Sequence, residues 1–340
     1  MNEIGDTKNS ISTRNAYFDN VKFVMIVLMV VGHFVDAFTA SSDMCKSAYM
    51  FIYSFHMPVF LFVSGLFYRM KDTRKKVLFY SFIGFATKMY LALCCILCKQ
   101  KSGFFLLSDV GVPWFMFVLA IYQILMWLFR DVHKIGLLIF SIILACFTGF
   151  DNSIRDYLYL SRVVVFFPFY LLGTMISSEQ FSNFKKKRSL ILMPMVILII
   201  GCAMYLSVYK LDSLYKFRHL LTGKNPFSDQ ILKYGILARF VCYAISALVG
   251  FSVMLCIPSR RIPMISKMGT KTLNAYFWHY GILLFLLKYT SVEKVFCASK
   301  TGKIAFLGIA VIVSIVLMII PLFDYPCKVI KKMCFTKQKD

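Results

Sequence analysis

Two ionisable side chains share one face of the first long apolar segment of the chain. The segment reads FDNVKFVMIVLMVVGHFVDAF and places Lys22 eleven positions before His33. In a helix of about 100° per residue, this spacing returns to within roughly 20° of the same face and spans about 16 Å. A neutral imidazole can accept a proton from a hydroxyl group, and an ammonium group can bind an anion. The pair therefore predicts a catalytic base with a cationic binding group below it.

Two carboxylates flank this pair at helical spacing. Asp36 lies one turn beyond His33, where it could orient the imidazole as the third member of a catalytic triad does. Asp19 lies one turn before Lys22, where it could form an ion pair. The alternatives are structural: Lys22 extends to the membrane interface, and His33 hydrogen-bonds a neighbouring helix.

The second apolar segment, YMFIYSFHMPVFLFVSGLFYR, carries a further histidine, His56. Pro58 follows it, and because proline lacks an N–H group it frees a backbone carbonyl and predicts a kink. Ser64 and Gly65 are small enough to predict a close approach by another helix. Arg69 ends the segment, at the same membrane face as Lys22 in the topology given below.

Four later residues are candidates for the substrate side of a site. Trp114 opens a later apolar segment, and Arg162 precedes VVVFFPFYLLG, in which Pro168 predicts a helix break. Tyr276 and His279 lie one turn apart in NAYFWHYG. Packing, hydrogen bonding or interface anchoring are the alternatives for each. No GxSxG, P-loop, HExxH or GxGxxG pattern predicts an active site of a soluble type.

The composition requires these residues to be positioned by membrane helices. Of 340 residues, 59% are hydrophobic and only 16% are charged, with a mean hydropathy of +0.71. So few charges cannot cover a water-soluble surface, which excludes an ordinary soluble enzyme, a disordered chain and a disulfide-stapled miniprotein. The 11 cysteines show no zinc or redox spacing, and we predict no metal. We predict an all-α polytopic membrane protein.

About ten apolar segments are long enough to cross a bilayer, which needs about 20 residues per helix. The predicted spans are 22–40, 49–68, 77–98, 113–130, 135–150, 163–178, 189–209, 232–257, 272–290 and 304–323. They form a single integral-membrane domain over residues 1–340, with a core at about 15–325. The N-terminal stretch lacks a cleavable signal pattern, so the first apolar segment is expected to remain as the first span.

The charge distribution predicts the orientation of the chain. Its net charge of +23 comes from 39 Lys and Arg against 16 Asp and Glu. More of the cations fall on the side of the two termini, which predicts both termini in the cytoplasm, and we predict no nucleic-acid partner. The long segment 210–231 then lies outside, as a lid, an acceptor-binding loop or a plain connector.

With these residues in place, the sequence resembles the membrane acyltransferase-3 family, in particular its branch described as fucose 4-O-acetylase-like. The pair Lys22-x10-His33 fits the opening signature of that family, a basic residue followed after ten positions by histidine. The blocks DNVKFVMIVLMVVGHF and SFHMPVFLFVSGLFYR carry the resemblance. VPWFMFVLA, FFPFYLLGTM and NAYFWHYG follow in the same order, so that the resemblance covers about residues 15–325.

The resemblance implies a ten-helix enzyme of the bacterial cytoplasmic membrane that transfers acyl groups, often acetyl from acetyl-CoA, to hydroxyl groups of exported or surface glycans. It also implies that His33 is the catalytic histidine and that Lys22 and Arg69 face the donor. The donor can be acetyl or succinyl, and the acceptor a glycan, peptide, lipid or small molecule. His33 can act directly as a base or carry the acyl group. His56 or a freed backbone amide is our suggestion for the group that stabilises the oxyanion.

Two other classes of function compete with acyl transfer. A proton-coupled transporter of a small anionic or sugar substrate would also place His and Lys inside the membrane. Transporters often contain inverted repeats with paired broken helices, and we find no such symmetry. A non-catalytic assembly or sensor protein is the second rival. The sequence predicts no oligomeric state.

Overall fold

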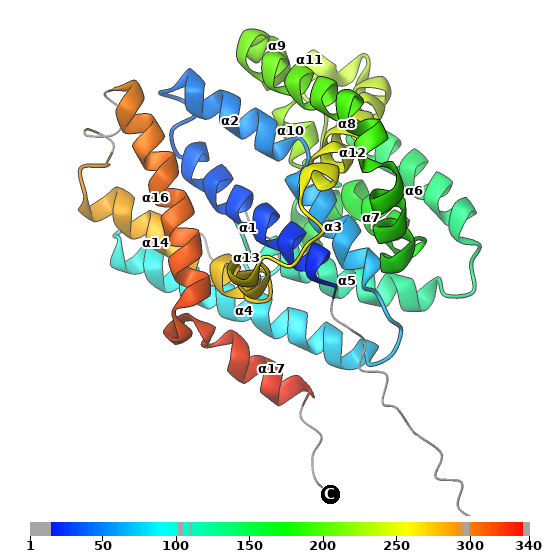
Figure 1. The fold of residues 1–340 in the computed structure, drawn as a ribbon, viewed down its shortest axis with the longest axis horizontal. Helices are drawn as coiled ribbons and strands as arrows, with labels where there is room; N and C mark the ends of the chain where they lie inside the picture. Colours follow the sequence, from blue (N-terminus) through cyan, green and yellow to red (C-terminus); the bar gives the residue numbers. More distant parts are fainter. Residues whose placement is uncertain (1–14, 101–104, 109–110, 293, 295–298, 336–340) are drawn as a thin grey trace, which may run out of the picture.

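The computed structural model describes residues 15–100, 105–108, 111–292, 294 and 299–335, and these form helices joined by turns (Figure 1). The long helices are α1 (Ala16–Asp36), α2 (Asp43–Tyr53), α3 (His56–Leu66), α4 (Thr73–Leu97), α5 (Trp114–Leu128), α6 (Lys134–Phe147), α7 (Leu160–Thr174), α8 (Ser178–Tyr209), α12 (Gly235–Cys256), α14 (Thr272–Tyr289) and α16 (Lys300–Ile319). The short helices are α9 (Leu211–Tyr215), α10 (Arg218–Leu221), α11 (Asp229–Leu232), α13 (Pro263–Met268) and α17 (Cys327–Phe335).

The predicted all-α membrane fold is confirmed in the described part of the chain. Seven helical segments there are long and apolar enough to cross a membrane: α1, α2 with α3, α4, α7 with the turn before it, α8, α12 and α16. The apolar helices α5 and α6 are shorter, and α14 lies where the ninth span was predicted. Each predicted span therefore contains a helix, while the number that cross the bilayer and the side of the termini stay predictions.

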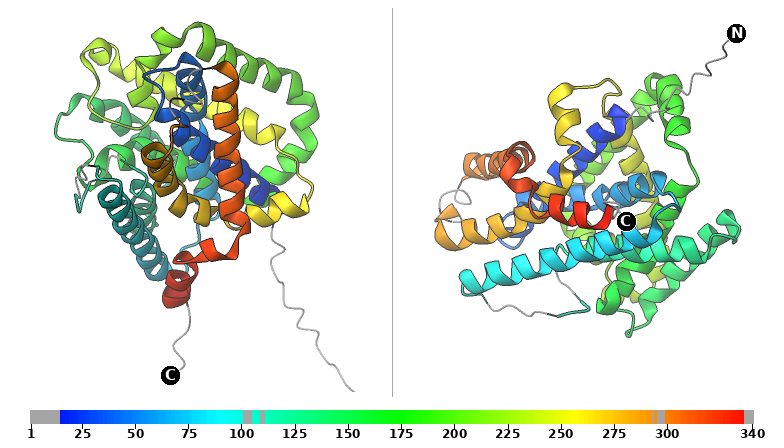
Figure 2. Two further views of the ribbon diagram at one scale, coloured as in Figure 1. Left: turned by 90° about the vertical axis from the view of Figure 1, so that its left-hand side faces the viewer. Right: turned by 90° about the horizontal axis from the view of Figure 1, so that it is seen from below.

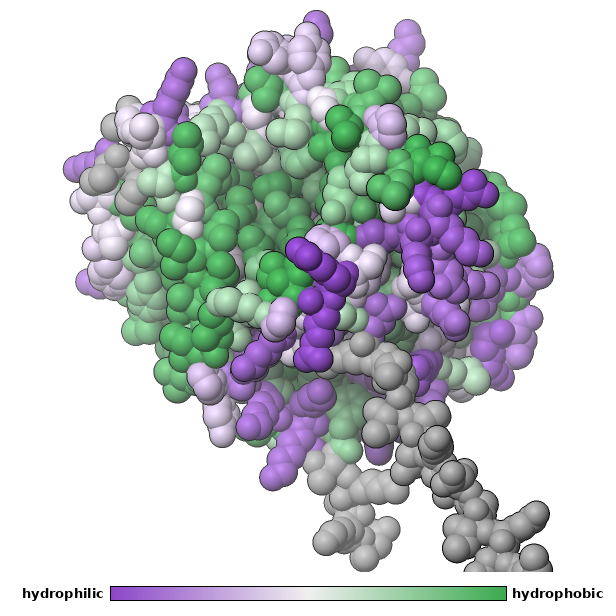
Figure 3. Space-filling view, viewed as in Figure 1, coloured by the Kyte–Doolittle hydropathy of each residue, from purple (hydrophilic) through white to green (hydrophobic). Residues whose placement is uncertain are grey.

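Helix α1 is the central element of the bundle. It packs against α2, α13, α14 and α16, whereas α8 lies at the periphery (Figures 1 and 2). Leu190, Ile191 and Leu198 of α8 are 84%, 68% and 71% exposed, and Figure 3 shows hydrophobic side chains over much of one face. Such a surface is stable in contact with lipid. The short helices α9 and α11 lie at the end of the molecule opposite α17 (Figure 1).

The second span is broken between α2 and α3, close to the predicted kink. Pro58 is the third residue of α3, where its missing N–H group removes no hydrogen bond within that helix. The first bond of α3 runs from Val59 N to Phe55 O at 3.0 Å. The Ser54 carbonyl, which an N–H at position 58 would have bonded, instead accepts the hydroxyl of Ser246 from α12. The predicted free carbonyl is therefore confirmed, and a neighbouring helix uses it.

The predicted break at Pro168 is wrong, because α7 is continuous from Leu160 to Thr174. Most of the helix is buried, so its neighbours hold it in shape. The hydroxyl of Tyr243 on α12 donates to the carbonyl of Val165, in the turn that the proline loosens. A hydrogen bond from a neighbouring helix thus supports α7 in the turn where Pro168 removes a bond within the helix.

Helices α3 and α7 cross at van der Waals contact through two glycines. A Cβ atom at Gly65 would lie 2.0 Å from the carbonyl oxygen of Tyr170, and one at Gly173 would lie 2.1 Å from that of Phe62. The predicted close approach at Gly65 is confirmed. Ser64 is not needed for it, since its hydroxyl bonds back to the Phe60 carbonyl at 2.8 Å.

We predict that Gly65→Ala lowers the free energy of unfolding by about 1–3 kcal/mol, because the added methyl group overlaps backbone atoms that cannot rotate away. Gly201→Ala is the matched control, since a Cβ there meets nothing within 4 Å. The control should be neutral or gain about 0.5–1 kcal/mol from higher helix propensity. Unfolding by detergent titration measures both, and equal stability of the two variants would contradict the packing described here.

Candidate active site

His33 lies inside the bundle, at a point where α1, α2 and α14 meet. Its Nδ1 atom is 3.4 Å from the hydroxyl oxygen of Tyr53. Its ring centroid is 5.2 Å from that of His279 and 5.6 Å from that of Tyr280. The imidazole is half-buried, and its neighbours are groups that can donate or accept a proton.

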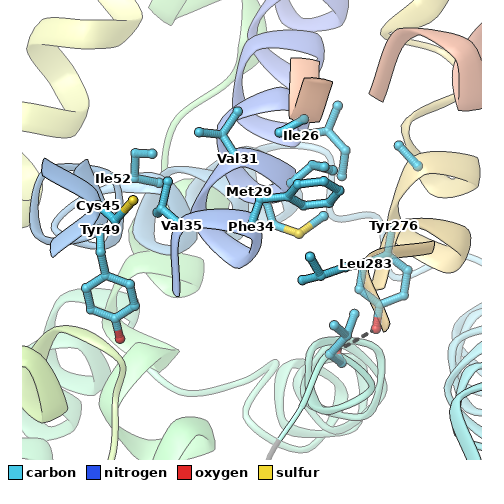
Figure 4. Packing of buried hydrophobic residues seen from close by; sticks show 14 of the residues in the cluster. Ile26, Met29, Val31, Phe34, Val35, Cys45, Tyr49, Ile52, Tyr276 and Leu283 are labelled. Atoms are coloured by element: carbon cyan, nitrogen blue, oxygen red, sulfur yellow. Dashed lines mark hydrogen bonds between the residues drawn. The ribbon is translucent and has the colours of Figure 1, made fainter. Parts of the chain in front are cut away.

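Hydrophobic packing fixes the position of α1 around this point. Figure 4 shows Val31 and Val35 on the side of α2, and Met29 and Phe34 on the side of α14. Gly32 permits the close contact with α2, because a Cβ there would lie 3.1 Å from the Tyr53 ring. His33 is therefore presented by a helix that is held on two sides.

Two cavities of different chemistry meet at His33. One is apolar, with a volume of about 120 Å³, and the other is polar, with a volume of about 230 Å³. The residues common to both linings are His33, Tyr53, Met57 and Trp114. A group in either cavity can thus reach the imidazole, which suits a reaction between two substrates that arrive from different directions.

The apolar cavity extends from His33 along α1 toward the first turns of that helix. Ile26 and Met29 line it, and both lie between Lys22 and His33 in the sequence. Its other lining residues are His56, Phe60, Val112, Phe115, Met116, Thr272, Leu273 and Tyr276. The Tyr276 hydroxyl donates to the Val112 carbonyl at 2.9 Å, so it also joins α14 to the segment before α5 (Figure 4).

Lys22 and Arg69 lie beyond the apolar cavity and line neither of the two. The Lys22 ammonium nitrogen is 2.7 Å from a carboxylate oxygen of Asp19, which confirms the expected pair. Phe67, two residues before Arg69, has its ring 6.0 Å from the same nitrogen. Arg69 is exposed. The first turn of α1 and the end of α3 are therefore neighbours, and together they bring two cations to this end of the bundle.

The polar cavity gathers three more of the predicted residues. Asp36 and Trp114 line it with Arg162, whose guanidinium lies 4.9 Å from the centroid of the Trp114 ring. Arg162 also pairs with Asp156 at 3.4 Å. Asp36 shares the cavity with His33, and Tyr53 is the residue next to the His33 Nδ1 atom. No hydrogen bond links Asp36 to the imidazole in the described structure.

His56 and His279 have fixed tautomers. The Nδ1 atom of His56 is 2.9 Å from the Ile52 carbonyl, and that of His279 is 2.8 Å from the Ala275 carbonyl. A carbonyl only accepts, so Nδ1 carries the hydrogen in each ring and Nε2 is an acceptor. The Nε2 atom of His279 is fully buried with no hydrogen-bond partner among the described residues. Neutral His56 therefore has no Nε2 hydrogen to donate to an oxyanion.

Several site residues were not predicted from the sequence. Tyr53 contacts His33 and stacks on Tyr49, with ring centroids 4.0 Å apart. The segment 210–231 contributes five further residues to the lining of the polar cavity: Tyr215, Arg218, His219, Thr222 and Lys224. In the sequence, only the high cation content of this segment indicated that it contributes to a binding site. Burial, followed by the adjacent cations Arg218 and Lys224, lowers the pKa of His219 below its usual value.

Arg239 fixes this segment from inside the bundle. Its side chain is fully buried on α12, and it donates to the Leu220 carbonyl at 3.1 Å and to Asn225 Oδ1 at 2.5 Å. Lys88 on α4 has a comparable role, because its ammonium group donates to the carbonyls of Phe105 and Leu106, both at 2.7 Å. These two cations, which lie well inside predicted spans, therefore anchor loops.

A family model described as an acyltransferase domain matches residues 15–323, nearly the whole chain. The chain belongs to the acyltransferase-3 family. This membership agrees with the resemblance in the first two apolar segments and makes the protein a membrane acyltransferase. Searches of curated proteins and of solved structures gave no match. In this membrane acyltransferase, two cavities of different chemistry meet at His33.

We predict that Arg239→Gln releases the 210–231 segment, because it leaves the Leu220 carbonyl and Asn225 Oδ1 without their donor, at about 1–3 kcal/mol each. Trypsin should then cleave faster after the basic residues of this segment, as seen by mass spectrometry of the fragments. Arg261→Gln removes an exposed arginine and is the control. Equal cleavage rates in both variants would refute an anchoring role for Arg239.

Proposed function

We propose that this acyltransferase moves an acetyl group from cytoplasmic acetyl-CoA to a hydroxyl group of an exported or surface glycan, with His33 as the general base. The observation that carries the proposal is the position of His33 at the junction of an apolar and a polar cavity. An acyl thioester suits the first environment, and a hydroxylated acceptor suits the second.

The charges and shape at the α1 end favour a coenzyme A donor there. Acetyl-CoA carries phosphate groups, which Lys22 and Arg69 can bind near the predicted cytoplasmic face. Its acetyl group is at the end of a long flexible chain. The cavity lined by Ile26 and Met29 offers that chain an apolar route along α1 to His33.

The chemistry requires a particular tautomer of His33. For Nε2 to accept the acceptor's hydroxyl proton, Nδ1 must carry a hydrogen and donate it to the Tyr53 oxygen. The acceptor oxygen then attacks the thioester carbonyl, and an oxyanion forms. Its collapse expels the coenzyme A thiolate, which takes the proton from the His33 imidazolium and so restores the neutral base. The Tyr53 hydroxyl hydrogen is available to stabilise that oxyanion. When His33 has accepted the hydroxyl proton, the carboxylate of Asp36 in the same cavity stabilises the imidazolium electrostatically.

We predict that His33→Gln lowers acetyl transfer by about 10²–10⁴-fold, the usual contribution of a general base, with normal protein levels in the membrane. The assay follows radiolabel from acetyl-CoA into envelope glycans. His133→Gln, in an exposed turn, is the matched control and should keep full activity. Retained transfer in the His33 variant would remove His33 from the mechanism, and solute uptake without label transfer would favour a transporter.

We predict that Lys22→Gln raises the apparent KM for acetyl-CoA several-fold with a smaller change in kcat, because an exposed phosphate contact contributes about 1 kcal/mol. Lys187→Gln removes an exposed lysine from α8 and should leave both constants unchanged. Initial rates at varied acetyl-CoA concentration give the two constants. An unchanged KM in the Lys22 variant would leave Lys22 only its ion pair with Asp19.

A further inference from the structure

We infer that the acceptor carries an anionic group, a carboxylate or a phosphate, that binds Arg218 and Lys224 in the polar cavity beside His33. This inference rests on the proposed function, because it makes the polar cavity the acceptor site. It adds a substrate class, an acidic glycan unit, to the hydroxyl acceptor proposed above.

The first argument is the charge balance of the cavity lining. Three cations, Arg162, Arg218 and Lys224, face a single carboxylate, that of Asp36. Arg162 is already paired with Asp156 and covered by Trp114. Arg218 and Lys224 have no carboxylate within ion-pair distance in the described structure, although both are half-buried. The cations of this partly desolvated lining therefore outnumber the Asp36 carboxylate, and a bound anion offsets the excess positive charge.

The segment that carries the two cations is held in place. The guanidinium of Arg218 lies 4.5 Å from the centroid of the Tyr215 ring, a cation–π contact that restricts its side chain. Arg239 bonds the carbonyl of Leu220, which lies between the two cations in the sequence, and the side chain of Asn225, which directly follows Lys224. A preorganised pair of this kind binds an anion without a large loss of side-chain entropy.

The remaining lining fits a sugar ring that bears the anion. Aromatic side chains, on which the apolar face of a sugar can pack, surround the polar groups: Tyr49, Trp114, Tyr215 and Tyr280. At about 230 Å³ the cavity is smaller than the usual range for drug-sized ligands, and it is on the scale of one sugar unit. His33 lies in the same lining, so a hydroxyl group on that unit can reach it.

The position of the segment favours the acceptor over the donor as the source of the anion. Residues 210–231 are predicted to lie outside, whereas acetyl-CoA is cytoplasmic. In Figure 1, α9 and α11 lie at the opposite end of the molecule from α17. The donor's phosphates have their own cations in Lys22 and Arg69, at the far end of the apolar cavity.

The test uses the purified full-length protein in nanodiscs with radiolabelled acetyl-CoA. Envelope glycans of the source cells, separated by anion exchange into neutral and acidic fractions, serve as acceptors. We expect label in the acidic fraction. Arg218→Gln and Lys224→Gln should each raise the apparent KM for that fraction about tenfold and leave the KM for acetyl-CoA unchanged. Lys216→Gln removes an exposed cation from the same segment and should change neither constant.

A binding measurement separates this inference from the proposed function. Glucuronate, but not glucose, should raise the Tm of the wild-type protein, and Arg218→Gln with Lys224→Gln should abolish the difference. Any one of three results would overturn the inference. These are label confined to the neutral fraction, equal effects of glucuronate and glucose on the Tm, and variants that raise only the KM for acetyl-CoA. Absence of label from every fraction, with the glucuronate effect intact, would instead contradict acetyl transfer while leaving an anion site.

Discussion

The site depends on one backbone interaction in the second span, the transfer of the Ser54 carbonyl from its own helix to Ser246 of α12. Pro58 cannot bond that carbonyl, and inside a bilayer an unbonded carbonyl is expensive. The helix therefore ends at Tyr53 and restarts at His56, and a neighbouring helix supplies the missing donor. The break leaves the Tyr53 hydroxyl beside His33 and sets His56 in the wall of the apolar cavity.

The same constraint explains the cations that lie within the spans. A charged side chain in a membrane protein must find partners, and Arg239 and Lys88 find them in carbonyl groups of the loops. Carbonyl groups of the loop that each cation holds accept its hydrogen bonds. The segment fixed by Arg239 contributes residues to the lining of the polar cavity that His33 also lines. The two anchoring cations are therefore distinct from Lys22, Arg69, Arg218 and Lys224, the cations of the proposed binding sites.

Much of this arrangement is predictable from the sequence, and the rest is not, for physical reasons. The length of the apolar segments predicted the helices. The period of 3.6 residues placed Lys22, Asp19 and His33 correctly along α1, because spacing within one helix does not depend on other helices. Tyr53 and the lining residues of the 210–231 segment could not be predicted, because contacts between helices decide them. Pro168 did not break its helix because α7 is buried among its neighbours and a hydrogen bond from Tyr243 of α12 supports the same turn.

The central claim is that His33 joins a donor and an acceptor that reach it from opposite membrane faces. The most direct measurement uses proteoliposomes of uniform orientation, with labelled acetyl-CoA only at the face of Lys22 and envelope glycan only at the face of the 210–231 segment. Label should appear on the glycan, and no label should appear when the two substrates exchange sides. Transfer that requires both substrates on one face would contradict it.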